Sequence, residues 1–150
     1  MRVFNRKWIA VLATLLVSDV LVARADAVPG SDIDVAPEAK RIRAILQRIR
    51  AKTSHARIIL LAVFPREEKP DHPRRRQIIE INKLLAEFGQ VPGITYLDLG
   101  PELLQPDGTL SRENMSDFCH PTEKGYQIWG DAIKPLLTAG DSAAGSVTPK

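Results

Sequence analysis

Apolar positions recur along this chain with two different periods, and the periods predict its helices and strands. In residues 37 to 52 apolar side chains stand three and four positions apart, the spacing of one face of a helix. This stripe consists of Ile42, Ile45, Leu46 and Ile49. The opposite, solvated sides carry Arg41, Arg43, Arg48 and Arg50. The segment is therefore predicted to be an amphipathic helix that packs on a core.

The next two elements are predicted from a continuous apolar run and from a second helical stripe. Residues 56 to 65, ARIILLAVFP, have the length and lack of polar alternation typical of a parallel strand buried on both faces. Residues 74 to 88 then form a helical pattern, with Gly89 expected as its C-cap. Its stripe consists of Ile78, Ile81, Leu84, Leu85 and Phe88. A second short strand is predicted at residues 94 to 100, ITYLDLG.

The last part of the chain is predicted to be a loop followed by a helix. Residues 101 to 114 read as a loop with one short helical turn. After His120, Pro121 and Thr122 open a helix that Pro135 is expected to kink. Its apolar residues are expected in the core: Tyr126, Ile128, Trp129, Ile133, Leu136 and Leu137. The order helix, strand, helix, strand, helix predicts an α/β fold with a parallel sheet.

Composition and charge limit the classes of partner. The 150 residues are enough for one domain, and 44% apolar with 26% charged residues is typical of a globular protein. Of the net charge of +3, all falls within residues 1 to 25, where four basic residues face one acidic residue. The rest of the chain is close to neutral. Nucleic-acid binding needs excess positive charge on the folded domain, so no nucleic-acid partner is predicted.

The first 27 residues have the order of a secretory signal. Basic residues precede an apolar run from Trp8 to Ala23, and Ala23-Arg24-Ala25 or Ala25-Asp26-Ala27 fits a cleavage site. Residues 1 to 27 are thus predicted to be a signal peptide or a substituted N-terminal segment, which would make the protein secreted or periplasmic. Asp19 within the run favours the alternative, a buried strand or helix of the domain itself. The domain then spans residues 28 to 137, and residues 138 to 150 read as a disordered tail.

Candidate chemistry lies just before the last helix, where Asp117 precedes His120 by three positions. Three residues on a loop allow a carboxylate to fold back onto an imidazole, as in the acid and base of a charge relay. The plainer alternative is a surface histidine near a helix start. Cys119, the single cysteine of the sequence, invites a Cys-His nucleophile. Adjacent side chains on a loop usually point apart, which favours a packed thiol.

The residues around this pair resemble a known family. DFCHPTEKGYQIWGDAIKPLL, residues 117 to 137, resembles the C-terminal block of the SGNH, or GDSL-type, esterases and acylhydrolases. ARIILLAVFPRE, the R-x-x-I-x-x-I-N pattern from Arg75 to Asn82, and TYLDLGPELLQPDGTL are similar to the branch of platelet-activating-factor acetylhydrolase subunits. The resemblance covers roughly residues 36 to 137.

The resemblance implies a fold, a reaction and two roles. The fold would be a three-layer α/β/α sandwich with a flavodoxin-like parallel sheet, without a metal or other cofactor. The reaction would be hydrolysis of a small-molecule ester, a lipid or an acetylated carbohydrate through a serine acyl-enzyme. Asp117 and His120 would be the acid and the general base of the triad.

The sequence departs from the family pattern at the nucleophile. No Gly-Asp-Ser occurs, and residues 30 to 32 carry Gly, Ser and Asp in another order. The first two strands of the family have no counterpart unless the run from Trp8 to Ala23 supplies one, so an incomplete, C-terminal part of the fold is predicted. The strand at 57 to 64 would then have an unpaired edge, open to a homo-oligomer. The alternative function is a non-catalytic remnant or an interaction module that uses this edge.

Two further clusters read as surface. Arg74, Arg75 and Arg76 could hold an anion, but a solvated run is the simpler interpretation. Asp71 and His72 have no partner at metal-ligand spacing and are predicted to lie on an exposed loop.

Overall fold

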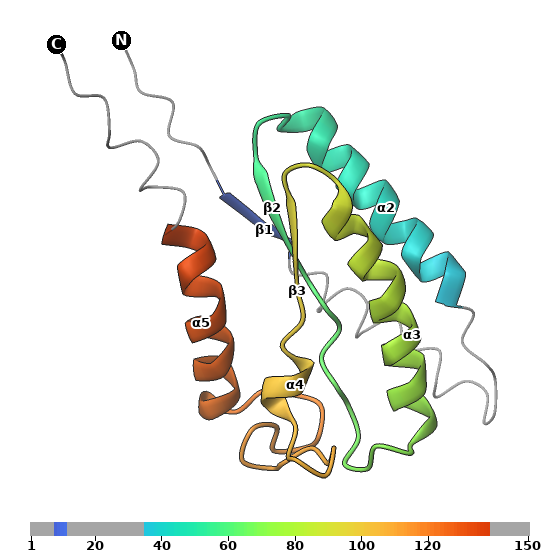
Figure 1. The fold of residues 1–150 in the computed structure, drawn as a ribbon, viewed down its shortest axis with the longest axis vertical. Coiled ribbons are helices and arrows are strands. Elements are labelled where there is room, and N and C mark those ends of the chain that lie inside the picture. Colours follow the sequence, from blue (N-terminus) through green and yellow to red (C-terminus); the bar gives the residue numbers. More distant parts are fainter. Residues whose placement is uncertain (1–7, 12–34, 139–150) are drawn as a thin grey trace, which may run out of the picture.

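The fold is an α/β arrangement whose elements follow one another in the predicted order. The computed structural model describes residues 8–11 and 35–138. The strands are β1 (Trp8–Val11), β2 (Arg57–Leu61) and β3 (Ile94–Leu97). The helices are α2 (Val35–Lys52), α3 (Pro73–Glu87), the 3-10 turn η1 (Phe88–Gln90), α4 (Gly100–Leu103) and α5 (Glu123–Thr138). Figure 1 shows these elements along the chain.

The described strands form a parallel sheet in the order β1-β2-β3. Ile58 of β2 stands opposite Ile9 of β1 and Ile94 of β3. The predicted unpaired edge of β2 is therefore wrong, because β1 supplies the missing neighbour. β1 comes from the apolar run that also fits a signal peptide, and it matches the alternative in which this run belongs to the domain. The signal peptide at 1–27 and the tail at 138–150 fall largely outside the described residues and stay predictions; of the tail, Thr138 is the last residue of α5.

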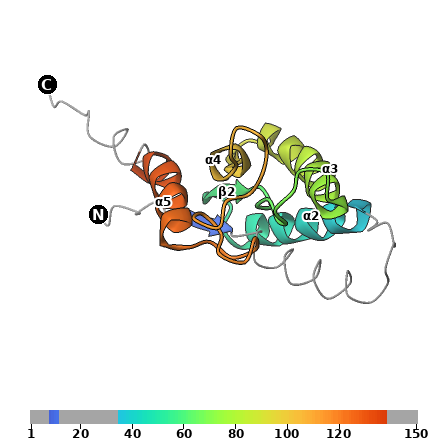
Figure 2. The same cartoon turned by 90° about the horizontal axis from the view of Figure 1, so that it is seen from below.

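The helices cover the two faces of the sheet. α2 and α3 lie side by side on one face, and α5 lies on the opposite side of the strands (Figures 1 and 2). The predicted three-layer α/β/α arrangement with a parallel sheet is therefore confirmed. Across the part of the chain that the structure describes, no helix has the length and apolar character needed to cross a membrane.

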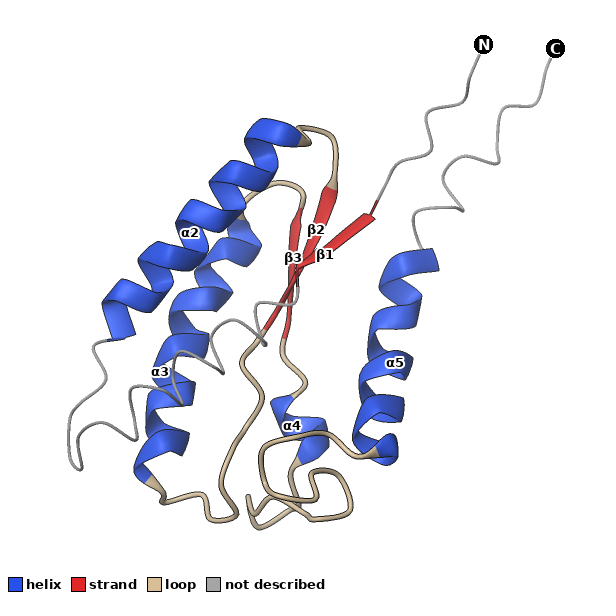
Figure 3. Cartoon of the chain, turned by 180° about the vertical axis from the view of Figure 1, so that it is seen from behind, coloured by secondary structure: helices blue, strands red, loops and turns tan. Residues whose placement is uncertain are grey.

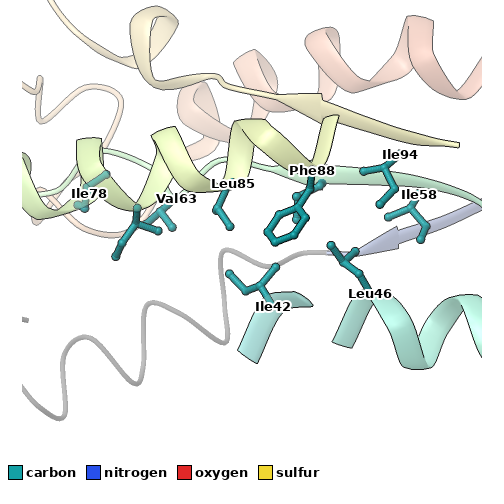
Figure 4. Packing of buried hydrophobic residues seen from close by; sticks show 10 residues of the cluster. Ile42, Leu46, Ile58, Val63, Ile78, Leu85, Phe88 and Ile94 are labelled. Carbon is teal, nitrogen blue, oxygen red and sulfur yellow. The ribbon is translucent and has the colours of Figure 1, made fainter. Parts of the chain in front are cut away.

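The main core lies between β2 and the pair α2 and α3. Side chains alternate along a strand, so Ile58 and Leu60 face these helices and join Ile81 and Leu85 of α3. The intervening Ile59 and Leu61 are equally buried, which explains why β2 is a continuous apolar run. Figure 4 shows this packing. The cluster comprises Ile42, Leu46, Ile58, Leu60, Val63, Ile78, Ile81, Leu85, Phe88 and Ile94.

Two details of the helix predictions are wrong. α3 ends at Glu87 with Phe88 as its C-cap in a right-handed conformation, so Gly89 is not the cap. Gly89 instead allows close approach, since a Cβ there would lie 3.0 Å from Cβ of Tyr96. Tyr126 is 55% exposed rather than in the core. The reason is that α5 buries no side chain fully, and its other predicted core residues are only half-buried.

Asn82 of α3 holds the chain just after β2 in place. Its Oδ1 accepts a hydrogen bond from the backbone N–H of Val63 at 2.8 Å, and its Nδ2 donates to the Val63 carbonyl at 2.9 Å. Val63 is 1% exposed, so water cannot replace these bonds. Asn82 therefore orients the segment that leads from the sheet to the loops below it.

Replacing Asn82 with alanine is expected to lower the free energy of unfolding by about 2 to 6 kcal/mol. Two buried backbone groups would lose their partners, at about 1 to 3 kcal/mol each. Urea denaturation followed by circular dichroism measures the change. Lys83→Ala is the matched control, because its ion pair with Glu80 is exposed and worth under about 1 kcal/mol. Equal stability of the two variants would contradict the role given to Asn82.

Candidate functional site

Asp117 and His120 lie on a loop at the carboxyl ends of β2 and β3. This loop, together with α4, occupies the end of the molecule toward which these strands run (Figure 3). It is tied to the segment after β2, because Glu67 N–H donates to the Phe118 carbonyl at 3.0 Å. Ligand sites of parallel sheets gather at this edge, so the pair lies where such a site is expected.

The side chains of Asp117 and His120 are directly paired. Nδ1 of His120 lies 2.7 Å from Oδ2 of Asp117. Oδ1 of Asp117 accepts the backbone N–H groups of Cys119 at 3.0 Å and of His120 at 2.8 Å. Phe118 adopts a left-handed conformation, with φ of 60°, and this lets the chain turn back over the carboxylate. The predicted pairing is confirmed. Oδ2 of Asp117 contacts the imidazole, and Oδ1 accepts the backbone N–H groups of the turn.

The hydrogen bonds favour the ionised form of Asp117 and set the tautomer of His120. The His120 side chain, followed by the backbone N–H bonds, holds the pKa of Asp117 far below its usual range. The carboxylate is therefore ionised down to strongly acidic pH and can only accept. Nδ1 must then carry a proton, which leaves Nε2 of the neutral ring free to accept one. Because the side chains of His120 and Asp117 are 77% and 53% exposed, water screens their attraction.

Cys119 points back toward the imidazole. Its Sγ lies 3.8 Å from Nε2 of His120, so the expectation that these adjacent side chains point apart is wrong. The reason is the tight turn around Asp117 Oδ1. The thiol is half-buried. Burial raises the pKa of the Cys119 thiol, and the neighbouring Arg66 guanidinium opposes that rise.

A buried asparagine that was not predicted from the sequence, Asn114, anchors the loop that carries Asp117 and His120. Nδ2 of Asn114 donates to the Leu103 carbonyl at 2.9 Å, and the Asn114 carbonyl accepts the Thr122 N–H at 2.9 Å. Gly125 of α5 sits directly against that carbonyl, since an added Cβ would overlap it. A buried asparagine in a loop has no periodicity, so no signal in one sequence could have identified it.

Arg66 was also not predicted as part of this site. It is 9% exposed, and its Nε has no hydrogen-bond partner among the described residues. It follows Pro65 at the end of the buried run, where site residues of parallel sheets gather, and this position was the available signal.

The other predicted surface clusters are partly structural. Arg75 is 5% exposed and donates to the Gly108 carbonyl, so the interpretation of a fully solvated run is wrong for this residue. It also lines a cavity of about 220 Å³ between α3 and α4. His72 is half-buried and caps α3 by accepting the Arg74 N–H at 3.3 Å. The described residues hold no group of three or more His, Cys, Asp or Glu arranged for a metal ion.

No serine hydroxyl is hydrogen-bonded to His120 within residues 8–11 and 35–138. Ser54 lies in the turn between α2 and β2, at the amino end of the strand and away from the site. Ser18 and the Gly30-Ser31-Asp32 stretch lie outside the described residues. The structure thus pairs the side chains of Asp117 and His120, and among the described residues no serine hydroxyl is hydrogen-bonded to the imidazole.

Comparisons with known proteins agree with the motifs. The family model described as GDSL-like Lipase/Acylhydrolase family matches residues 18–128. The chain is 36% identical over 96 residues to platelet-activating factor acetylhydrolase IB subunit alpha2 of Gallus gallus. The aligned region covers 63% of this chain and 40% of the relative. It is 33% identical over 97 residues to subunit alpha1 of Homo sapiens, covering 64% of this chain and 42% of the relative.

Solved structures show the same fold. A GDSL-like lipase from Bacteroides thetaiotaomicron superposes with a TM-score of 0.61 at 19% identity, covering 74% of this chain and 56% of that one. The chain therefore spans less than half the length of the curated relatives described above, and about half of this structure.

Proposed function

The chain belongs to the GDSL-like lipase/acylhydrolase family, and from this premise we propose that it hydrolyses carboxylic esters, with Asp117 orienting His120 as general base. The observation that carries the proposal is the 2.7 Å contact between Oδ2 of Asp117 and Nδ1 of His120. A histidine held in this way by an ionised carboxylate has one fixed tautomer, and its free Nε2 can take a proton from a nucleophile.

The reaction proceeds through an acyl-enzyme. His120 removes the proton of the nucleophile as it attacks the ester carbonyl, and Asp117 stabilises the imidazolium that forms. The imidazolium then protonates the departing alcohol. In the second half His120 activates water, which releases the acid and restores the nucleophile.

The proposed substrate is an ester of an acetyl or another short acyl group. The alcohol part is a small molecule, a lipid or a carbohydrate. The names of the matched relatives, which specify an acetylhydrolase, support the acetyl group. The exposure of His120, at 77%, supports esters that approach from solvent without entering a deep pocket.

Hydrolysis of p-nitrophenyl acetate by the purified chain tests the proposal. We expect a rate above that of buffer, and His120→Ala should reduce it to the buffer rate because the general base is gone. His55→Ala is the matched control, since His55 lies in the turn before β2, away from the site. Equal rates for the protein, the His120 variant and buffer, with the fold intact by circular dichroism, would contradict the proposal.

A second function is favoured if that test fails. Tyr126 is 55% exposed on α5, and the half-buried apolar side chains beside it could contact another chain. The protein would then be a non-catalytic remnant or interaction module, self-associating through this helix or through the outer strands β1 and β3. Export to a secreted or periplasmic location through residues 1–27 is a separate proposal, and cleavage of this segment would remove β1 from the sheet.

A further inference from the structure

We propose that the cavity between α3 and α4 binds a small monocarboxylate that carries a short aliphatic chain. The cavity has a volume of about 220 Å³ and is lined by α3, by α4 and by the segments that follow β2 and β3. Neither Asp117 nor His120 lines it. The site is therefore separate from this pair and does not depend on the proposed ester hydrolysis.

Arg75 brings a buried positive charge without a counter-ion to this cavity. The residue is 5% exposed, and its Nη1 is buried with no hydrogen-bond partner in the described part of the chain. No carboxylate within the described ranges forms an ion pair with it. Burial lowers the pKa of the Arg75 guanidinium, but an arginine stays protonated at neutral pH. A buried, unpaired charge is costly, and a bound carboxylate would neutralise it.

Arg75 also has a structural role, which a ligand would leave in place. Its Nη2 donates to the Gly108 carbonyl, and the Gly108 N–H donates to the Gln105 carbonyl at 2.8 Å. The guanidinium thus ties the turn after α4 to α3 through one nitrogen. The other terminal nitrogen, Nη1, is left to donate a charge-assisted hydrogen bond to a carboxylate oxygen.

Apolar side chains form most of the remaining wall of the cavity. They are Val63, Pro65, Ile78, Ile79, Pro101 and Leu104. Because a cavity of about 150 Å³ is large enough for benzene, 220 Å³ admits an aliphatic chain of about six carbons. Drug-sized ligands occupy pockets of about 300 Å³ or more. The ligand is therefore small, with an apolar body and one charged end that meets Arg75.

Asp98 limits the ligand to one negative charge. It lines the same cavity, it is exposed, and its Oδ1 accepts the Gly100 N–H at 2.8 Å. A phosphate or a second carboxylate on the ligand would lie close to this carboxylate, and the like charges would repel each other. The cavity therefore favours a monocarboxylate over phosphate or a dicarboxylate.

Isothermal titration of the full chain with sodium hexanoate tests the site. We expect one hexanoate per chain with a Kd of about 1 mM or below, which is within reach of a ligand of about eight heavy atoms. 1-Hexanol has the chain without the charge, and inorganic phosphate has charge without the chain. Each should bind at least about tenfold more weakly than hexanoate. The NMR shifts of the Gly100 and Gly108 amides should change with hexanoate, because these glycines lie at the cavity and at its arginine.

Ile79→Glu is the variant that tests the location of binding. Ile79 lines the cavity and is 52% exposed, so a glutamate there is compatible with the fold and repels a carboxylate. Val91→Glu is the matched control, since Val91 is 43% exposed and does not line the cavity. We expect the affinity for hexanoate to fall about tenfold or more in Ile79→Glu and to stay within about twofold in Val91→Glu. Arg75→Met, where circular dichroism shows that it is folded, should bind hexanoate no more tightly than 1-hexanol.

Binding that selects hexanoate, weakens in Ile79→Glu and persists in Val91→Glu supports the site. It is overturned if binding does not saturate up to about 20 mM hexanoate, or if 1-hexanol or phosphate binds as tightly as hexanoate. Equal affinity in Ile79→Glu and the wild type would overturn it as well. Hydrolysis of p-nitrophenyl acetate by wild type and His120→Ala reports on the proposed function separately, whether or not hexanoate binds.

Discussion

Replacing Asp117 with asparagine is expected to lower the rate of p-nitrophenyl acetate hydrolysis about a hundredfold while the loop stays folded. Oδ1 of asparagine can still accept the backbone N–H groups of Cys119 and His120. The amide group in place of Oδ2 cannot accept from Nδ1 or stabilise an imidazolium, so the ring is held in the wrong tautomer. The change therefore removes the electrostatic role of Asp117 and keeps its structural role.

The size of the effect follows from exposure. In a buried triad the same substitution costs about 10⁴-fold. Here the Asp117 and His120 side chains are 53% and 77% exposed, so water replaces part of what the carboxylate provides. Because the hydrogen bonds hold the pKa of Asp117 far below its usual range, the wild-type carboxylate stays ionised in mild acid. The contribution of Asp117 to stability is likewise present above its unfolded pKa and is lost only as the pH falls through its lowered folded pKa.

Asp107→Asn is the matched control for this prediction. Asp107 makes a similar turn, in which its Oδ1 accepts the Thr109 N–H at 2.9 Å, but no described histidine is hydrogen-bonded to its side chain. Its variant should hydrolyse the ester at the wild-type rate. An equal loss in both variants would indicate a general effect of neutralising a carboxylate, and a full rate in Asp117→Asn would remove the acid from the relay.

The elements that local periodicity encodes could be predicted from the sequence. Each of these elements shows its apolar pattern within one short segment of the sequence. They are the helical stripe with Ile42 and Leu46, the buried run of β2 and the helical stripe with Ile81. The pairing of Asp117 with His120 was also accessible, because three residues suffice to close that turn. Predictions of this kind need no knowledge of what lies across the fold.

The remainder depends on contacts that one segment does not encode. The pairing of β1 with β2 joins residues far apart, and an apolar run after basic residues has the same composition whether it is a strand or an export signal. The orientation of Cys119 toward His120 depends on the left-handed conformation of Phe118, which its residue type does not favour. Tyr126 was misplaced because periodicity identifies an apolar face of α5 and says nothing of what covers it.

Replacing Gly125 with alanine is expected to destabilise the protein by about 1 to 3 kcal/mol and to slow ester hydrolysis together. A Cβ at this position would overlap the Asn114 carbonyl oxygen. That oxygen cannot easily move, because it accepts the Thr122 N–H at 2.9 Å and the Asn114 side chain is anchored to Leu103. The clash must therefore displace the loop that carries Asp117 and His120, at the usual cost of overpacking.

Gly130→Ala is the matched control, because Gly130 lies in the same helix and a Cβ there has nothing within 4 Å. It should stabilise the protein by about 0.5 to 1 kcal/mol, since alanine favours a helix interior over glycine. Urea denaturation should then show opposite changes in the free energy of unfolding for the two variants, and hydrolysis should slow only in Gly125→Ala. If Gly125→Ala were as stable and as active as Gly130→Ala, the close approach of α5 to Asn114 would not be what positions the pair.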